Sequence, residues 1–81
     1  MSVRFEDRVI ILEGDCQVDE AEQLLELLLA EPAAAVDWSG CVQLHTALLQ
    51  VLLAVRPVVV GSPESQFLRR WIAPLVRQRR G

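Results

Sequence analysis

The fold of this chain follows most directly from residues 33–61, whose sequence is AAAVDWSGCVQLHTALLQVLLAVRPVVVG. The apolar run from Ala33 to Trp38 is too short for a helix and is typical of a buried parallel strand that is closed by Ser39-Gly40. Residues 46–55 predict a helix that is apolar nearly all round, and residues 58–61 predict a second short strand of β-branched residues. A strand, a helix and a strand in succession indicate parallel pairing.

The residues before this unit predict a β-hairpin and then a helix. Ser2–Phe5 and Arg8–Leu12 have the composition of strands, with Glu6-Asp7 as the connection and Gly14 as the end of the second strand. The second strand is apolar on both faces, as in a covered sheet, so we expect helices to cover it.

The first helix is expected to run from about Asp19 to about Glu31. Asp19 and Glu22 have the spacing of a capping box, and Pro32 stops the helix. The residues predicted to face the core lie at helical spacing: Ala21, Leu24, Leu25 and Leu28.

The last helix is expected to begin with Ser62 as its N-cap and Pro63 as its first residue. Pro74 is expected to kink this helix or end it near Ala73, which leaves residues 77–81 as a frayed basic tail. Its inward face is predicted to contain Phe67, Leu68, Trp71, Ile72 and Leu75.

The predicted order is therefore β-β-α-β-α-β-α in a single α/β domain over residues 1–81, with helices packed on a four-stranded mixed sheet. Hydrophobic residues make up 52% of the chain and charged residues 23%, a composition that favours folding over disorder. The only cysteines, Cys16 and Cys41, are expected to be reduced and buried. The sequence has neither an apolar run of about 18 residues nor a signal-peptide pattern, so we expect a cytoplasmic protein without membrane insertion.

Charge is distributed unevenly along the chain, whose net charge is −3. Residues 1–40 hold ten of the eleven acidic residues, whereas residues 41–81 hold six of the eight arginines. This layout predicts an acidic surface near the first helix and a basic one near the last, which would steer a partner. Five arginines lie in the last part of the chain: Arg69, Arg70, Arg77, Arg79 and Arg80. They lack the aromatic interleaving or the recognition helix of a nucleic-acid site, so no nucleic-acid partner is expected.

Catalytic signatures are missing from the sequence. The chain has one histidine and no lysine, tyrosine, glycine-rich phosphate loop or nucleophile elbow, so we expect neither an enzyme nor a cofactor. An enzyme stays open only as a remote alternative. A metal site would need Cys41 and His45 to meet the distant Cys16 and a fourth group such as Asp15, and a hydrolytic site would use Ser39 with Asp37 and His45, whose spacing does not match a known motif.

Thr46 is the most informative polar residue, since it stands at the predicted start of the apolar helix. Its hydroxyl can cap the helix by accepting a hydrogen bond from an amide one turn further on. The same position can also accept a phosphate, because the unpaired amides and the helix dipole stabilise negative charge there. Both interpretations stay open.

Two segments of this sequence resemble the STAS family, which includes anti-sigma-factor antagonists. Ala35–Gly40 followed by Leu44–Gln50 resembles the central strand, Ser-Gly turn and helix start of the family. Arg56–Pro63 and the closing amphipathic helix resemble its final strand and helix, and the likeness covers residues 3–76.

The resemblance implies that Thr46 matches the serine or threonine that a partner kinase phosphorylates in anti-sigma-factor antagonists. The acidic residue and the glycine of the family pattern are replaced here by His45 and Leu48. The predicted partner-binding residues are Ser39, Gly40, His45, Thr46, Ala47 and Leu48.

These observations predict a non-catalytic module of bacterial regulation that binds a protein partner. The partner would be an anti-sigma factor or kinase-like protein, and an apolar second helix in so small a domain favours an exposed docking flank. The alternative is a constitutive subunit, either a homodimer or the cytoplasmic STAS component of a membrane or lipid transporter.

Overall fold

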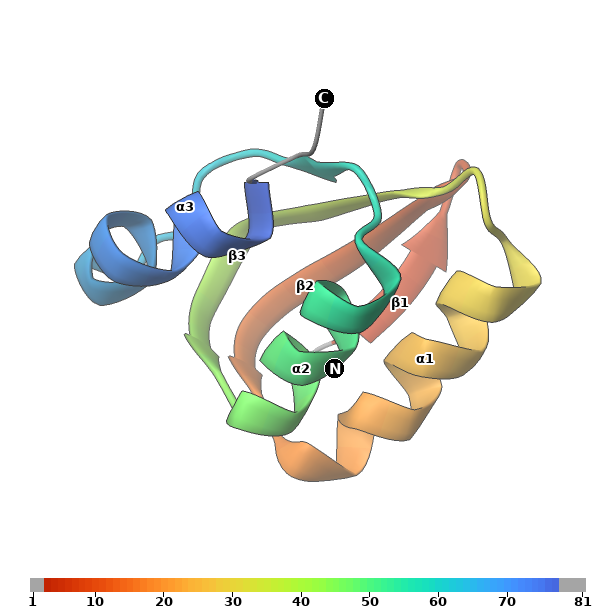
Figure 1. Ribbon diagram of the computed structural model, residues 1–81, viewed down its shortest axis with the longest axis horizontal. Helices are drawn as coiled ribbons and strands as arrows, with labels where there is room; N and C mark the ends of the chain where they lie inside the picture. Colours follow the sequence, from red (N-terminus) through yellow and green to blue (C-terminus); the bar gives the residue numbers. More distant parts are fainter. Residues whose placement is uncertain (1–2, 78–81) are drawn as a thin grey trace.

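The computed structural model describes residues 3–77 and shows an α/β fold with a four-stranded mixed sheet (Figure 1). The elements follow in the order β1 (Val3–Glu6), β2 (Val9–Cys16), η1 (Val18–Glu20), α1 (Ala21–Ala30), β3 (Ala35–Leu44), α2 (Thr46–Val55), β4 (Val59–Val60), η2 (Leu68–Ile72) and α3 (Ala73–Arg77). The sheet order is β1-β2-β3-β4, with β1 antiparallel to β2 and the other pairs parallel. The predicted fold class is confirmed.

The β1–β2 hairpin turns at Asp7-Arg8, one residue later than predicted. Glu6 pairs with Val9, and the two residues between them have φ angles of 50° and 67°. Two positive φ angles in a two-residue connection match the right-handed twist of the flanking strands, which explains the shift.

Strands β2 and β3 are both longer than the sequence predicts, because neither Gly14 nor Ser39-Gly40 ends its strand. The pairing moves from Ile11 opposite Asp37 to Glu13 opposite Gly40, so β3 carries one extra residue there. A second irregularity follows between Gly14 and Asp15. Such bulges let a strand absorb an extra residue and continue.

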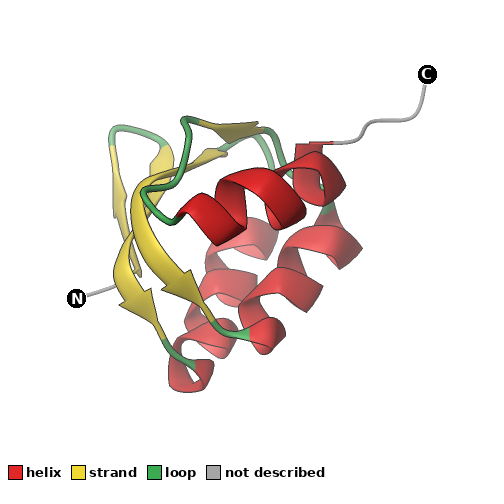
Figure 2. Ribbon diagram, turned by 90° about the vertical axis from the view of Figure 1, so that its left-hand side faces the viewer, coloured by secondary structure: helices red, strands yellow, loops and turns green. Residues whose placement is uncertain are grey.

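All helices lie on one face of the sheet, as Figure 2 shows. The strand order runs β2, β3, β4 without reversal, and right-handed crossovers then place every connecting helix on the same side. The expectation that helices cover β2 therefore holds for one face only. On the other face Arg4 pairs with Glu13, with an Nη1 to Oε1 distance of 2.9 Å.

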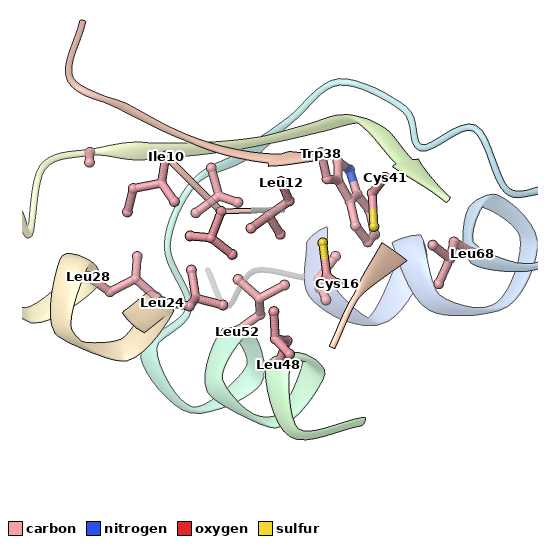
Figure 3. Close-up of a cluster of buried hydrophobic side chains, with 14 residues drawn as sticks. Ile10, Leu12, Cys16, Leu24, Leu28, Trp38, Cys41, Leu48, Leu52 and Leu68 are labelled. Atoms are coloured by element: carbon pink, nitrogen blue, oxygen red, sulfur yellow. The ribbon is translucent and has the colours of Figure 1, made fainter. Parts of the chain in front are cut away.

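The core lies between the sheet and the helices (Figure 3). Its largest fully buried side chain is that of Trp38, whose Nε1 donates to the carbonyl oxygen of Gly61 at 3.1 Å. Cys16 and Cys41 are free thiols, and both are buried in this core. The other core residues are Val3, Ile10, Leu12, Leu24, Leu28, Ala34, Val36, Leu48, Leu52, Leu68 and Val76.

Helix α1 starts differently from the prediction. The backbone N–H of Gln17 donates to Oε1 of Glu20 at 3.3 Å, so the reciprocal cap involves this pair and not Asp19 with Glu22. On the inward face Leu24 and Leu28 are buried as predicted, but Leu25 is exposed and Leu27 packs against the core instead.

The C-terminal helical segment is capped by Ser65, whose Oγ accepts from the backbone N–H of Leu68 at 3.3 Å. The predicted start at Ser62-Pro63 was therefore wrong by about one turn. Pro74 neither ends nor breaks the segment, because the preceding π turn η2 absorbs it, with the Ala73 N–H donating to the Leu68 carbonyl. Arg77 belongs to α3, and the rest of the predicted tail lies outside the described residues.

The apolar residues of this segment separate into two rows, and all of them except Val76 were predicted to face inward. Leu68, Ile72 and Val76 are buried or half-buried, whereas Phe67, Trp71 and Leu75 are exposed. In both rows the residues are spaced four apart. An α-helix has 3.6 residues per turn, so residues four apart drift around it, and the wider π turn reduces this drift.

Candidate functional site

The start of α2 is fixed by β3 and by a histidine cap. The backbone N–H of His45 donates to the carbonyl of Cys16 at 2.9 Å, which ties the β3–α2 junction to the end of β2. The imidazole Nδ1 of His45 then accepts from the N–H of Ala47 at 3.0 Å. The His45 side chain is therefore the acceptor that caps the helix.

Thr46 is the first residue of α2, and its side chain is exposed. Of the two interpretations left open for Thr46, the structure does not show the capping one, because His45 occupies the capping position. Within residues 3–77 the Thr46 hydroxyl has no hydrogen-bond partner. It is thus an accessible nucleophilic oxygen at the start of a ten-residue helix, where the helix dipole stabilises added negative charge. The N–H groups of Ala47, Leu48 and Leu49 already donate to His45.

The neighbours of Thr46 along α2 point inward. Ala47 is half-buried, and the side chain of Leu48 is 0% exposed. Leu48 therefore belongs to the core and not to the exposed surface. The apolar circumference of α2 is also largely covered, since these residues pack against the core: Leu49, Val51, Leu53 and Val55.

Exposed apolar surface near Thr46 comes from other elements. A groove of about 320 Å³ separates the end of β3 from the C-terminal helical segment, and its lining residues are Val42, Gln43, Leu44, Ser65, Phe67 and Leu68. Leu44 directly precedes the His45 cap, so the groove opens next to the start of α2. Sequence reasoning assigned Phe67 to the core. Four-residue spacing divides the apolar residues of this segment into two rows, but the spacing is the same in both and does not say which row is exposed.

Ser39 and Gly40 lie apart from Thr46, because β3 continues through them. From Gly40 to His45 the strand covers roughly 15 Å. Ser39 instead turns to Asp37, with its hydroxyl donating to Oδ1 at 2.7 Å and its N–H donating to the same oxygen at 2.9 Å. Both hydrogen bonds lower the pKa of Asp37, and the one from the hydroxyl has the larger effect. The predicted partner-binding residues are therefore not one cluster.

The same placement separates the residues of the enzyme alternative. Asp37 and Ser39 lie on β3, whereas His45 lies beyond its end. Across residues 3–77 no group of three or more histidine, cysteine, aspartate or glutamate side chains could hold a metal ion.

The two thiols lie on neighbouring strands and interact. A hydrogen bond with Cys41, together with burial, raises the pKa of Cys16, and the same hydrogen bond lowers the pKa of Cys41. Since both side chains are 0% exposed, neither thiol is presented to a substrate.

Searches against protein-family models, curated proteins and solved structures find no match to this chain. The resemblance to the STAS family stays a prediction from the residues quoted above. In the described part of the chain, no helix has both the length and the apolar character needed to cross a membrane.

Proposed function

We propose that this chain is a non-catalytic protein-interaction domain of the STAS type that binds a regulatory protein at the start of α2. The observation that carries the proposal is the Thr46 hydroxyl, which is exposed and free of hydrogen bonds because His45 caps the helix. The adjoining groove supplies the apolar contact area, since Val42 and Phe67 on its lining are both exposed.

Phosphorylation of Thr46 is the proposed switch. A partner kinase transfers the γ-phosphoryl group of ATP to Oγ1 of Thr46: the new Oγ1–P bond forms as the bond to the β-phosphate oxygen breaks, ADP leaves, and the hydroxyl proton passes to a base of the kinase. The product carries nearly two additional negative charges, which the dipole of α2 can stabilise at the start of the helix without unfolding the domain. A partner that fits the neutral helix start must then accommodate a charged phosphate, and binding weakens.

The test compares the wild-type chain with Thr46→Glu, Thr46→Ser and the control Ser62→Glu. The control places the same charge on an exposed loop residue away from the start of α2. Tagged wild-type protein first captures its partner from native extract, and calorimetry with the purified partner then gives the affinities. We expect Thr46→Glu to weaken binding at least about tenfold, or about 1.4 kcal/mol, with the other two variants close to wild type.

A folding control accompanies the affinities. Glutamate at the first residue of α2 interacts favourably with the helix dipole, by about 0.3–1 kcal/mol, so Thr46→Glu should unfold no earlier than wild type on heating. Equal affinity of Thr46→Glu and Thr46→Ser for the partner would reject the switch and favour a constitutive subunit.

A further inference from the structure

The outer row of the C-terminal helical segment is both apolar and basic. Phe67, Trp71 and Leu75 are 63%, 59% and 45% exposed. The guanidinium of Arg70 lies 5.2 Å from the centre of the Trp71 ring. From Ser65 to Arg77 the sequence has three arginines and no acidic residue, so this row, which we call the basic row, carries net positive charge.

A second exposed row on α1 has the opposite charge. Leu25 and Leu29 are 38% and 67% exposed, and Glu22 and Glu26 beside them are exposed as well. These four residues are spaced i, i+3, i+4 and i+7, which places them on one side of the helix. No basic residue occurs between Gln17 and Glu31, so this acidic row has no compensating charge of its own.

The two rows cannot meet within one molecule. Helices α1 and α3 lie on opposite sides of α2 in the helical layer (Figure 1). Each row is therefore exposed in the isolated domain, and each is an apolar strip with flanking charge of one sign.

We propose that the acidic row of one copy of this chain binds the basic row of a second copy. Packing a row against its own counterpart would oppose like charges, glutamate against glutamate or arginine against arginine, which disfavours a two-fold symmetric contact. The opposite pairing places Leu25 and Leu29 against the aromatic rings and lets Glu26 approach Arg70 of the other copy. Leucine–aromatic contact and charge pairing then favour the same arrangement.

This contact is heterologous, so each bound molecule keeps one free row and assembly continues as a chain or closes as a ring. A few side chains from one helix on each side form a small interface, so we expect association in the range of about 10 μM to 1 mM. Opposite charges drive it, so added salt should weaken it. The inference does not depend on the role proposed for Thr46, which lies in neither row; the two proposed surfaces share Phe67, which belongs to the basic row and also lines the groove.

The test measures the mass of the full chain by sedimentation at increasing concentration in low salt. We expect the weight-average mass of the wild type to grow with concentration, and the variants Leu29→Ser and Trp71→Ser each to stay monomeric. A one-to-one mixture of the two variants keeps one intact row on each partner and should form a dimer that grows no further. Val58→Ser, at an exposed apolar residue outside both rows, is the matched control and should assemble like wild type.

Charge exchange gives a second measurement that does not rely on removing apolar side chains. Glu26→Arg and Arg70→Glu should each abolish assembly, and the double variant should restore it. A wild type that stays monomeric at about 1 mM overturns the proposal. So does a mixture of Leu29→Ser and Trp71→Ser that remains monomeric, or binding of the basic row to anionic lipid vesicles without any self-association.

Discussion

Gly61 is the residue whose replacement the structure tolerates least among the glycines with positive φ. Its φ is 83°, and a Cβ added there would overlap the Ser39 hydroxyl and approach Oδ1 of Asp37 to 2.8 Å. Gly14 has a similar φ of 67° but open space around the added carbon. A substitution at Gly14 therefore measures the cost of backbone strain alone, whereas a substitution at Gly61 adds the cost of steric overlap.

We expect Gly14→Ala to lower the free energy of unfolding by about 1 kcal/mol, the cost of a left-handed backbone for an L-residue. Gly61→Ala should cost more, at least about 2–3 kcal/mol, because the backbone strain is joined by displacement of Ser39. Urea denaturation of the two variants measures the difference. Equal losses would mean that β4 moves freely away from β3.

The Asp37–Ser39 pair makes a specific prediction about pH. The hydrogen bonds from Ser39 hold the pKa of Asp37 below its ordinary value of 3.8, so they stabilise the folded state where the carboxylate is charged. This stabilisation is fully present above pH 3.8 and is lost as the pH falls through the lowered pKa. We expect Ser39→Ala to raise the pKa of Asp37 toward 3.8 in an NMR titration, whereas Ser62→Ala leaves it unchanged. The stability difference between wild type and Ser39→Ala should shrink in acid.

At the level of elements, the C-terminal helical segment shows how a helix continues through a proline. Pro74 has no N–H to donate, and the π turn before it keeps residues four apart in line. Arg56 also fastens the segment to the end of α2, with Nη1 donating to the Leu75 carbonyl at 2.9 Å. The segment thus holds a buried row and an exposed row in fixed positions.

The two rows provide a matched pair of leucines. Leu68→Ala should cost about 2–5 kcal/mol, because its side chain is buried and its removal leaves a cavity. Leu75→Ala should cost no more than about 0.5 kcal/mol, because its side chain is exposed. Thermal and urea unfolding measure both changes. A large loss for Leu75→Ala would show that the outer row packs inside the monomer.

At the level of the whole molecule, the parallel strands β2 and β3 form the centre of the fold, and each carries one buried thiol. Cys16 and Cys41 are both fully buried, so a thiol reagent reaches them only when the sheet and the helical layer separate. Their labelling therefore reports opening of the entire domain.

We expect an aromatic disulfide reagent at pH 8 to label the native protein at least about a thousandfold more slowly than the urea-unfolded protein. The unfolded chain, in which both thiols react at once, is the control. Rapid labelling of one thiol in the native state would contradict the prediction and indicate local opening at the ends of β2 and β3.

The sequence by itself determined the α/β class, the element order and the bounds of α2, because these depend on local hydrophobic periodicity and on breaking residues. It also indicated that Thr46 begins α2. Tertiary structure decided the features that involve pairing between distant segments. Because β2 and β3 pair with each other, β2 continues past Gly14 and β3 continues past Ser39, and this extension separates Ser39 from Thr46. The strand order without reversal leaves one face of the sheet without helices. Tertiary packing likewise covers Leu68 and Val76 but leaves Phe67, Trp71 and Leu75 at the surface, because exposure depends on which neighbours cover a side chain and not on its own hydrophobicity.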